Sequence, residues 1–231
     1  MINASDFTPP VTATDRRVYR IVPSIFPPVS VFDRVARPED LEAVFAIEAM
    51  TNDRLEDEAG NIRLVPLTDR VTGPGSTPIM AAFTHLNPEG GRFTDHSFGS
   101  YYASFEIETA VAETKHHREI FLARTREAPI DVDMRVYVAK AKADLHDIRK
   151  LQGSRPGLYA KDDYGASQAF ARRLRANGSD GIIYDSVRDP GGTCVAIFRP
   201  RLLSDCRQER HLTYRWDGVE IAEVYEKKAF P

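Results

Sequence analysis

The segment 109–117 has the clearest chemical potential in this sequence. It reads Thr-Ala-Val-Ala-Glu-Thr-Lys-His-His and places Glu113 three residues before His116, with His117 beside it. Residues i and i+3 share a helix face, and such Glu-x-x-His pairs ligate di-iron centres when a second copy and two further glutamates are present. The sequence has one such Glu-x-x-His pair, so it predicts no metal site. We expect both histidines to be ordinary helix residues.

Glu113 stands out for a second reason, which is its apolar surroundings. Residues 110–112 are Ala-Val-Ala, and Phe105 and Ile107 precede them. A buried carboxylate is unfavourable unless it is hydrogen-bonded or used. Glu113 is therefore a candidate functional carboxylate, with a surface residue or a satisfied salt bridge as the alternative.

Three further positions have suitable chemistry. In Gly90-Gly91-Arg92-Phe93 the glycines allow close backbone approach, and the Arg92 guanidinium can grip phosphate or carboxylate with two parallel hydrogen bonds. Tyr102 offers a flat ring for stacking, and Ser186 ends an expected strand just before a glycine-containing turn. The alternatives are a solvated arginine, a tyrosine that fills the core, and a serine that forms the turn.

The composition and net charge of the chain exclude several classes of function. The chain has 231 residues, 42% apolar and 28% charged, with a net charge of −3. Nucleic-acid binders usually carry a basic excess, so a small anionic ligand fits this charge balance better than DNA or RNA. Two cysteines, Cys194 and Cys206, cannot form a disulfide framework or a four-cysteine zinc site. Standard dinucleotide, P-loop, zincin and hydrolase-elbow motifs are absent from the sequence.

The N-terminus and the apolar pattern predict where the protein resides. Residues 1–6 lack the basic start and apolar core of a secretory signal, and no run approaches the ~20 apolar residues of a membrane-spanning helix. We therefore expect a cytoplasmic protein that does not bind membranes.

The spacing of apolar residues and the positions of glycine and proline predict the elements that must position these side chains. We expect an extended arm over 1–16 and an irregular segment over 60–79. The pattern predicts strands at 17–22, 80–86, 131–141, 181–187 and 193–198, and a hairpin over 214–220. It predicts helices from 38 to about 57, from 105 to about 124 with Ser104 as N-cap, and over 164–176. Short links between mixed elements predict a single α+β domain.

The order of the motifs resembles the RES-domain family, which is named for an arginine, a glutamate and a serine. The motifs are Tyr19-Arg20-Ile21, residues 90–93, Tyr102-Ala103-Ser104, residues 109–113 and residues 181–186. The resemblance covers about 17–203; we take 17–231 as the domain, with 24–79 as an elaboration. Phe93 stands where tryptophan is common in the family, and Thr94 where asparagine is common.

The resemblance implies a fold similar to ADP-ribosyltransferases and an enzyme that degrades NAD⁺. NAD⁺ would be a substrate, cleaved at its nicotinamide–ribose bond with inorganic phosphate or water as acceptor, and no cofactor would be needed. Members of the family commonly act as toxins restrained by an Xre-type antitoxin. Two alternatives remain open: an ADP-ribosyltransferase that modifies a macromolecule, and a catalytically silent binding module. Self-association of the chain is also left open.

The resemblance also implies roles for individual residues. Glu113 would contact the ribose hydroxyls and stabilise an oxocarbenium-like transition state. Tyr102 would stack on the nicotinamide or the ribose. Arg92 and Arg20 would pair with the pyrophosphate or the incoming phosphate, and Ser186 would form a hydrogen bond near the nicotinamide ribose.

Overall fold

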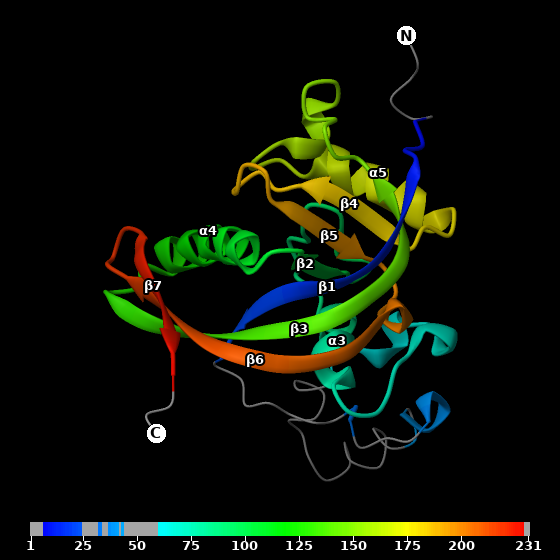
Figure 1. The fold of residues 1–231 in the computed structure, drawn as a ribbon, viewed down its shortest axis with the longest axis horizontal. Coiled ribbons are helices and arrows are strands. Elements are labelled where there is room, and N and C mark those ends of the chain that lie inside the picture. Colours follow the sequence, from blue (N-terminus) through cyan, green and yellow to red (C-terminus); the bar gives the residue numbers. More distant parts are fainter. Residues whose placement is uncertain (1–6, 25–31, 34–36, 42, 44–59, 229–231) are drawn as a thin grey trace.

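A computed structural model describes residues 7–24, 32–33, 37–41, 43 and 60–228 of the chain (Figure 1). The strands are β1 (Val11–Pro23), β2 (Tyr101–Ser104), β3 (Ile130–Asp147), β4 (Gly181–Asp185), β5 (Thr193–Ile197), β6 (Leu203–Trp216) and β7 (Ile221–Lys227). The α-helices in the described residues are α3 (Ser76–Thr84), α4 (Ile107–Thr125) and α5 (Gly165–Ala176). Short 3-10 helices occupy Pro38–Asp40, Ile62–Leu64, Leu67–Asp69, Pro156–Tyr159 and Pro200–Leu202.

The strands form one mixed sheet that closes on itself. Their order is β1-β2-β5-β4-β3-β6-β7, and β1 also pairs with β3 along its whole length. The long strands β1, β3 and β6 therefore lie side by side. The short strands β2, β5 and β4 complete the closed part of the sheet, from β1 back to β3 (Figure 1). One residue pair, Tyr19 with Ser104, joins β1 to β2. At the other end β4 runs parallel to the last residues of β3.

Three hydrophobic clusters hold the helices on this sheet. The first packs α3 against the inner side of β3 and the strands β2, β4 and β5; its largest fully buried side chains include Tyr101, Met80 and Leu145. The second packs α5 and the segment 93–98 on the other side of β4 and β5. The third packs α4 on β1, β3, β6 and β7.

Helix α4 is tied to the long strands by polar contacts as well as by apolar burial. The Thr114 hydroxyl lies 2.7 Å from the buried Tyr214 hydroxyl on β6. Just beyond the helix, the Trp216 indole N–H donates to the Glu127 carbonyl at 3.0 Å. The helix ends at Thr125 because Arg126 adopts a left-handed conformation with φ 55°. These contacts fix the rotation of α4 and hence the direction of Glu113.

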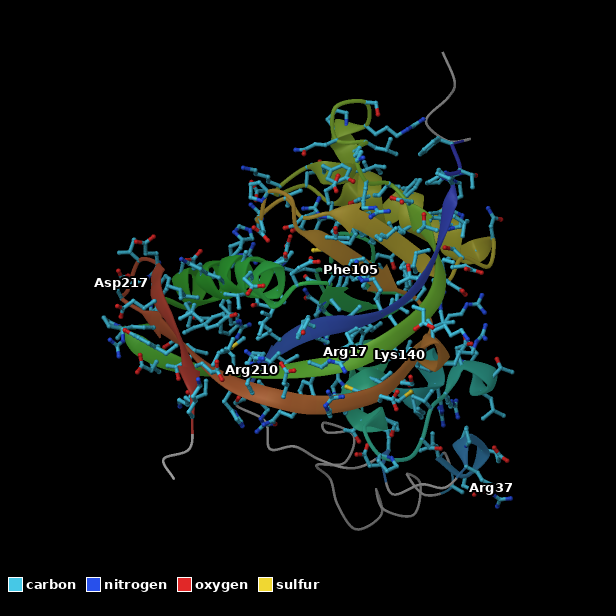
Figure 2. The ribbon with its side chains drawn as sticks, viewed as in Figure 1. Arg17, Arg37, Phe105, Lys140, Arg210 and Asp217 are labelled. Atoms are coloured by element: carbon cyan, nitrogen blue, oxygen red, sulfur yellow. The ribbon has the colours of Figure 1, made fainter. Side chains whose placement is uncertain are left out.

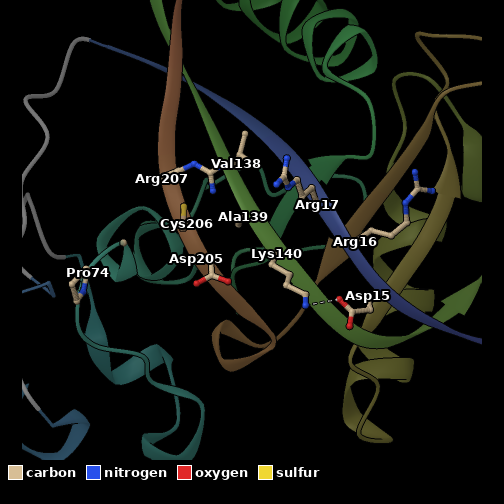
Figure 3. Close-up of a pocket in the computed structure, with 11 residues that line it drawn as sticks. Asp15, Arg16, Arg17, Pro74, Val138, Ala139, Lys140, Asp205, Cys206 and Arg207 are labelled. Atoms are coloured by element: carbon tan, nitrogen blue, oxygen red, sulfur yellow. Dashed lines mark ion pairs between the residues drawn. The ribbon is translucent and has the colours of Figure 1, made fainter.

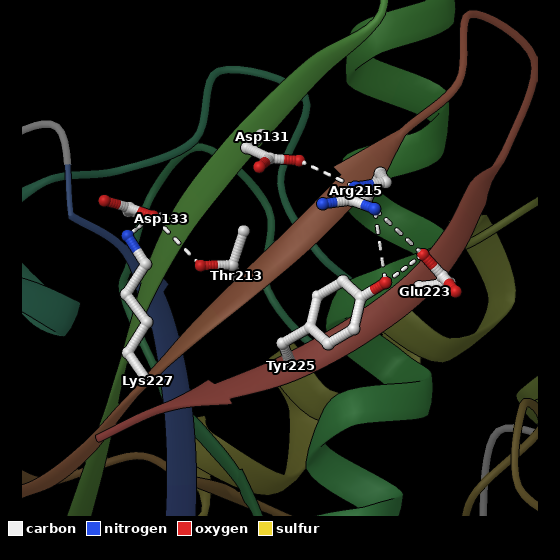
Figure 4. A network of polar contacts seen from close by, with 7 residues as sticks. All are labelled: Asp131, Asp133, Thr213, Arg215, Glu223, Tyr225 and Lys227. Carbon is white, nitrogen blue, oxygen red and sulfur yellow. Dashed lines mark hydrogen bonds and ion pairs between the residues drawn. The ribbon is translucent and has the colours of Figure 1, made fainter. Parts of the chain in front are cut away.

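The outer strand β7 is held by a ladder of charges on the face shown in Figure 4. Arg215 donates to Asp131 at 3.3 Å and to Glu223 at 3.2 Å, so one guanidinium bridges β3, β6 and β7. Lys227 reaches Asp133 at 2.5 Å, and the same carboxylate accepts from Thr213. Exposed pairs of this kind contribute little stability one by one, but several of them together reinforce the register.

The strand expected at 80–86 is wrong, because this segment lies mostly in α3. The helix begins at Ser76, directly after Gly75, whose φ of 82° suits a glycine. Ile79, Met80 and Phe83 are all buried in it. A short apolar run buried on several sides has no decisive period, so periodicity alone cannot separate strand from helix. The irregular segment expected over 60–79 therefore ends at Gly75.

The N-terminal boundaries also differ from expectation. Strand β1 begins at Val11, within the segment expected to be an arm, because residues 11–16 pair with the far end of β3. Ser104 is not an N-cap: it ends β2, its hydroxyl lies 3.4 Å from the Cys194 sulfur, and Glu106 precedes the helix instead. Of the helix expected from 38, Pro38–Asp40 is a 3-10 helix, and most of the remainder lies outside the described residues.

The other elements confirm the sequence-based expectations within a few residues. Helix α5, strands β4 and β5, and the hairpin turning at Asp217-Gly218 all occur, and β3 extends further than expected at its C-terminal end. The single α+β domain is confirmed. In the described part of the chain, no helix has the length and apolar character needed to cross a membrane.

Candidate functional site

Glu113 receives a hydrogen bond whose direction is fixed by the backbone. The Ser186 hydroxyl lies 2.5 Å from Glu113 Oε1. The same hydroxyl oxygen accepts from the N–H groups of Arg188 at 3.1 Å and Asp189 at 2.9 Å. Because both N–H groups use its lone pairs, the single hydroxyl proton points to the carboxylate. Glu113 is therefore held in one orientation as an acceptor.

The turn that presents Ser186 packs tightly on the first turn of α4. Ser186 N–H donates to the Gly192 carbonyl at 2.9 Å, which closes the turn. The Thr109 hydroxyl donates to Asp189 at 2.6 Å, which fastens the turn to the helix. A Cβ atom at Gly192 would lie 2.3 Å from Thr109 Oγ1 and 2.6 Å from Asp189 Oδ2. Only glycine fits between the turn and the helix.

We expect Gly192→Ala to destabilise the protein and to weaken any activity that depends on Ser186. Overpacking at this contact costs about 2 kcal/mol, which lowers Tm by about 4–8 °C in a chain of this size. Thermal melting of the variant checks this value. Gly153→Ala is the matched control, because no atom of the described residues lies within 4 Å of the added carbon. An unchanged Tm for Gly192→Ala would show that the turn is not packed as described.

Tyr102 is anchored to the turn that carries Arg92. Its hydroxyl accepts from the Phe93 N–H at 2.8 Å and lies 3.1 Å from Thr94 Oγ1. A Cβ at Gly91 would lie 2.9 Å from this hydroxyl, so the glycine permits the approach. Burial raises the pKa of Tyr102 to about 12, so the phenol is neutral at physiological pH.

Arg92 is buried, and the alternative of a solvated arginine is wrong. Its exposed fraction is 8%. Its Nη1 donates to the carbonyls of Ala160 at 2.8 Å and Leu158 at 3.3 Å, and its guanidinium lies 4.9 Å from the centre of the Tyr164 ring. Arg92 forms no ion pair with any carboxylate in the described residues. A positive charge is thus held in place by carbonyl groups, with no counter-ion from the residues that the structure describes.

A buried tyrosine connects these groups, and the sequence analysis missed it. Tyr184 meets Phe93 edge-on, with ring centres 4.8 Å apart. Burial raises the pKa of Tyr184 well above its usual value; Cys194, Glu113 and Tyr102 add to the shift, and the positive charge of Arg92 opposes it. Tyr184 also pairs across the sheet with Cys194, whose sulfur contacts Glu113, so it links the turn of Arg92 to the carboxylate. The sequence contained a signal for Tyr184. Residues two apart on a strand share a face, and Tyr184 precedes Ser186 by two positions, so both were expected on the same face.

A neutral thiol lies on the same side of Glu113. The Cys194 sulfur is 3.8 Å from Glu113 Oε1. Burial, reinforced by the negative charge of Glu113, raises the pKa of Cys194 to about 12. The thiol therefore stays protonated, which argues against a nucleophilic role. Both cysteines are free and buried.

Arg20 occupies a different position from the other candidates. Its Nη1 donates to the main-chain carbonyl of Tyr102 at 3.1 Å, and its guanidinium lies 5.0 Å from the centre of the Tyr101 ring. Burial lowers the pKa of Arg20 below its usual value. The structure thus groups Glu113, Ser186, Tyr102 and Arg92, and joins Arg20 to them through the backbone of β2.

Two cavities in the described residues involve none of these side chains. One, of about 780 Å³, lies on β1, β3 and β6 next to Pro74-Gly75 (Figure 3). Arg17 and Lys140 are cross-strand neighbours in it (Figure 2), and Lys140 pairs with Asp15 at 3.0 Å. Another, of about 510 Å³, lies between α5 and the preceding 3-10 helix. Among the described residues, no three His, Cys, Asp or Glu side chains are arranged to hold a metal.

Comparison with known proteins identifies the family. Over residues 68–217, well over half of the chain, the sequence matches the RES domain. The chain therefore belongs to the RES-domain family, and the resemblance based on its motifs is confirmed. The match includes Arg92, Tyr102, Glu113 and Ser186, whereas Arg20 precedes it.

Two similar proteins accompany this match. The uncharacterized protein y4oC of Sinorhizobium fredii is 33% identical over 216 residues, which cover 90% of this chain and 86% of the relative. A chain of the crystal structure of the M. tuberculosis MbcT-MbcA toxin-antitoxin complex is 12% identical, with a TM-score of 0.48, covering 88% of this chain and 86% of that one.

Proposed function

We propose that this protein cleaves NAD⁺ at the nicotinamide–ribose bond and acts as the toxin of a RES–Xre type module. Inorganic phosphate or water takes the ADP-ribose. The observation that carries the proposal is the Glu113 carboxylate, which is oriented by Ser186 and linked through Cys194 and Tyr184 to the turn that carries Arg92 and anchors Tyr102. Membership of the RES-domain family supports the same chemistry.

The charge changes of the reaction match what Glu113 supplies. When the C1″–N bond breaks, its electron pair goes to the nicotinamide ring, which becomes neutral. Positive charge then develops on the ribose, as in glycoside hydrolysis. A fixed carboxylate stabilises this charge without having to reorganise during the reaction. Ser186 acts on the reaction through Glu113 as a positioning residue, in addition to the ribose contact that the family resemblance implies.

The neighbouring groups complete the proposed site. Tyr102, as a neutral phenol, orients the nicotinamide or the ribose by stacking. Arg92 has no carboxylate partner in the part of the chain that the structure describes, and it binds phosphate oxygens of the substrate or the acceptor. Arg20, which is bound to the Tyr102 carbonyl, holds β2 in place and contributes positive charge from behind that strand.

The products formed from NAD⁺ with and without phosphate test the proposal. Nicotinamide with ADP-ribose-1″-phosphate is expected in phosphate, and nicotinamide with free ADP-ribose in its absence. Nicotinamide release that occurs only with a macromolecular acceptor, which becomes modified, would identify an ADP-ribosyltransferase instead. No nicotinamide release from folded protein would identify a silent binding module.

We expect Arg92→Lys to reduce kcat/KM for NAD⁺ by about 10–100-fold although the charge is kept. Lysine cannot satisfy two carbonyls and present a planar fork to an anion at the same time. Steady-state kinetics measure the effect, and Arg172→Lys is the control because the Arg172 side chain is exposed and pairs with Asp95 at 3.0 Å. Unchanged kinetics for Arg92→Lys would remove Arg92 from the substrate site.

A further inference from the structure

Arg188, which the sequence analysis did not single out, is held beside Arg92 by the same loop. Its Nη2 donates to the Lys161 carbonyl at 2.8 Å, and its side chain is 13% exposed. Arg92 donates to the preceding carbonyl, that of Ala160, also at 2.8 Å. Two consecutive carbonyls therefore hold two guanidinium groups, which come from turns far apart in the sequence.

Arg188 adjoins Glu113 through the turn that carries Ser186. The Arg188 N–H donates to Ser186 Oγ at 3.1 Å, and this hydroxyl lies 2.5 Å from Glu113 Oε1. His117 lies one helical turn beyond Glu113. Burial lowers the pKa of His117; Glu113 opposes this shift, and the positive charges of Arg188 and Arg92 add to it. The turn of Ser186 therefore places Arg188 next to the carboxylate, and the shift of the His117 pKa agrees with positive charge on this side of α4.

A buried ring nitrogen without a partner lies at the same place. His116 Nε2 is buried and forms no hydrogen bond within the described residues. The His116 ring meets His117 edge-on at 5.5 Å, and its pKa is lowered by burial and by the charge of Arg188. An unsatisfied buried polar atom is unfavourable, and a ligand oxygen would satisfy it.

The charge of the arginine pair is poorly compensated by the protein. Arg92 has no carboxylate partner among the described residues. Arg188 has Asp162 at 3.7 Å, but the Asp162 side chain is 85% exposed. Such a pair contributes little, because water and salt screen it. Two fixed guanidinium groups with a weak counter-charge favour an anion with several oxygens.

We propose that Arg92 and Arg188 together form a binding site for inorganic phosphate and deliver it as the acceptor next to Glu113. Its role as acceptor rests on the proposed function; the binding of phosphate does not. In the reaction, an oxygen of hydrogenphosphate forms the new bond to C1″ while the C1″–N bond breaks. The electron pair leaves with nicotinamide, and the phosphate keeps its proton or loses it to solvent.

Direct binding of inorganic phosphate tests the site without any need for activity. We expect calorimetric titration of the full chain to show phosphate binding that Arg188→Gln weakens by about 10-fold or more, as the loss of charged hydrogen bonds implies. Arg199→Gln is the matched control, because Arg199 also donates to a carbonyl (Gly178) and pairs with an aspartate (Asp180), but from the end of β5. Equal effects of both variants, or no phosphate binding, would overturn the proposal. Arg188→Lys should bind with intermediate affinity and shows whether a loss reflects misfolding.

Kinetics then separate the acceptor role from binding of the dinucleotide. Arg188→Gln should raise KM for phosphate by about 10-fold or more and shift products toward free ADP-ribose, with KM for NAD⁺ within about 3-fold. A rise in KM for NAD⁺ alone would assign the arginine pair to the pyrophosphate and overturn the proposal. If the wild-type protein binds phosphate but releases no nicotinamide, the proposed function fails while the phosphate site stands.

Discussion

Glu113→Gln should lower kcat for nicotinamide release by about 100-fold or more, a loss of about 3 kcal/mol of transition-state stabilisation. Glutamine nearly matches glutamate in shape, and its carbonyl oxygen can still accept from Ser186. The negative charge next to the ribose is lost, however. The fold and Tm should therefore be retained while the chemical step is slowed. Stopped assays of nicotinamide release, together with a thermal melt, measure both quantities.

The matched control is Glu108→Gln on the same helix. Glu108 is exposed and lies in the first turn of α4, so the substitution is the same but removes a charge from solvent. We expect turnover of this variant to equal that of the wild type. Near-normal turnover of a well-folded Glu113→Gln protein would contradict the assigned role of Glu113.

Expression of the wild-type chain in a bacterial host without an antitoxin should arrest growth and deplete NAD⁺. The coenzyme pool is shared by the whole cell, so an unrestrained enzyme that consumes it cannot be tolerated at high turnover. The Glu113→Gln form should do neither, because it keeps the fold but lacks the chemical step. Growth curves and extracted NAD⁺ after induction measure the outcome.

The result in cells separates the toxin role from the chemistry. A partner protein that covers the surface around Arg92, Tyr102 and Glu113 should relieve the arrest, because the substrate needs access to these groups. Normal growth and normal NAD⁺ in cells with abundant folded protein would contradict the toxin role. Such a result would leave cleavage of NAD⁺ by the purified protein as a separate question.

The sequence could single out the residues of the candidate site but not most of their contacts. Glu113, Arg92 and Tyr102 stand out because each lies in a local motif whose residue types already suggest chemistry. Their contacts are not local. Ser186 reaches Glu113 across 73 residues, and the carbonyl that holds Arg92 is 68 residues away. Arg188 becomes a candidate only once the fold places the segment 158–162 beside it. No pattern in the sequence predicts that contact.

The fold shows the same division between local and long-range information. Helix α5 and the hairpin of β6 and β7 were predictable, because a helical period or an Asp-Gly turn specifies them over a few residues. Strand β1 was predicted too short, because Val11 gains its pairing only from His146 in β3. Helix α3 was mistaken for a strand because burial on several sides removed the alternation that distinguishes the two.

The closure of the sheet also determines when the site can come into existence during synthesis. Strand β1 pairs with β3 between residues such as Val11 and His146, which are 135 positions apart, and β5 must then join β2 to β4. Pairings at such separations raise the contact order and slow folding. A ribosome-bound chain that ends before β5 has Glu113 and Arg92 but lacks the strand between β2 and β4. The protein therefore acquires its candidate site only after β5 has been synthesised, and it does so slowly.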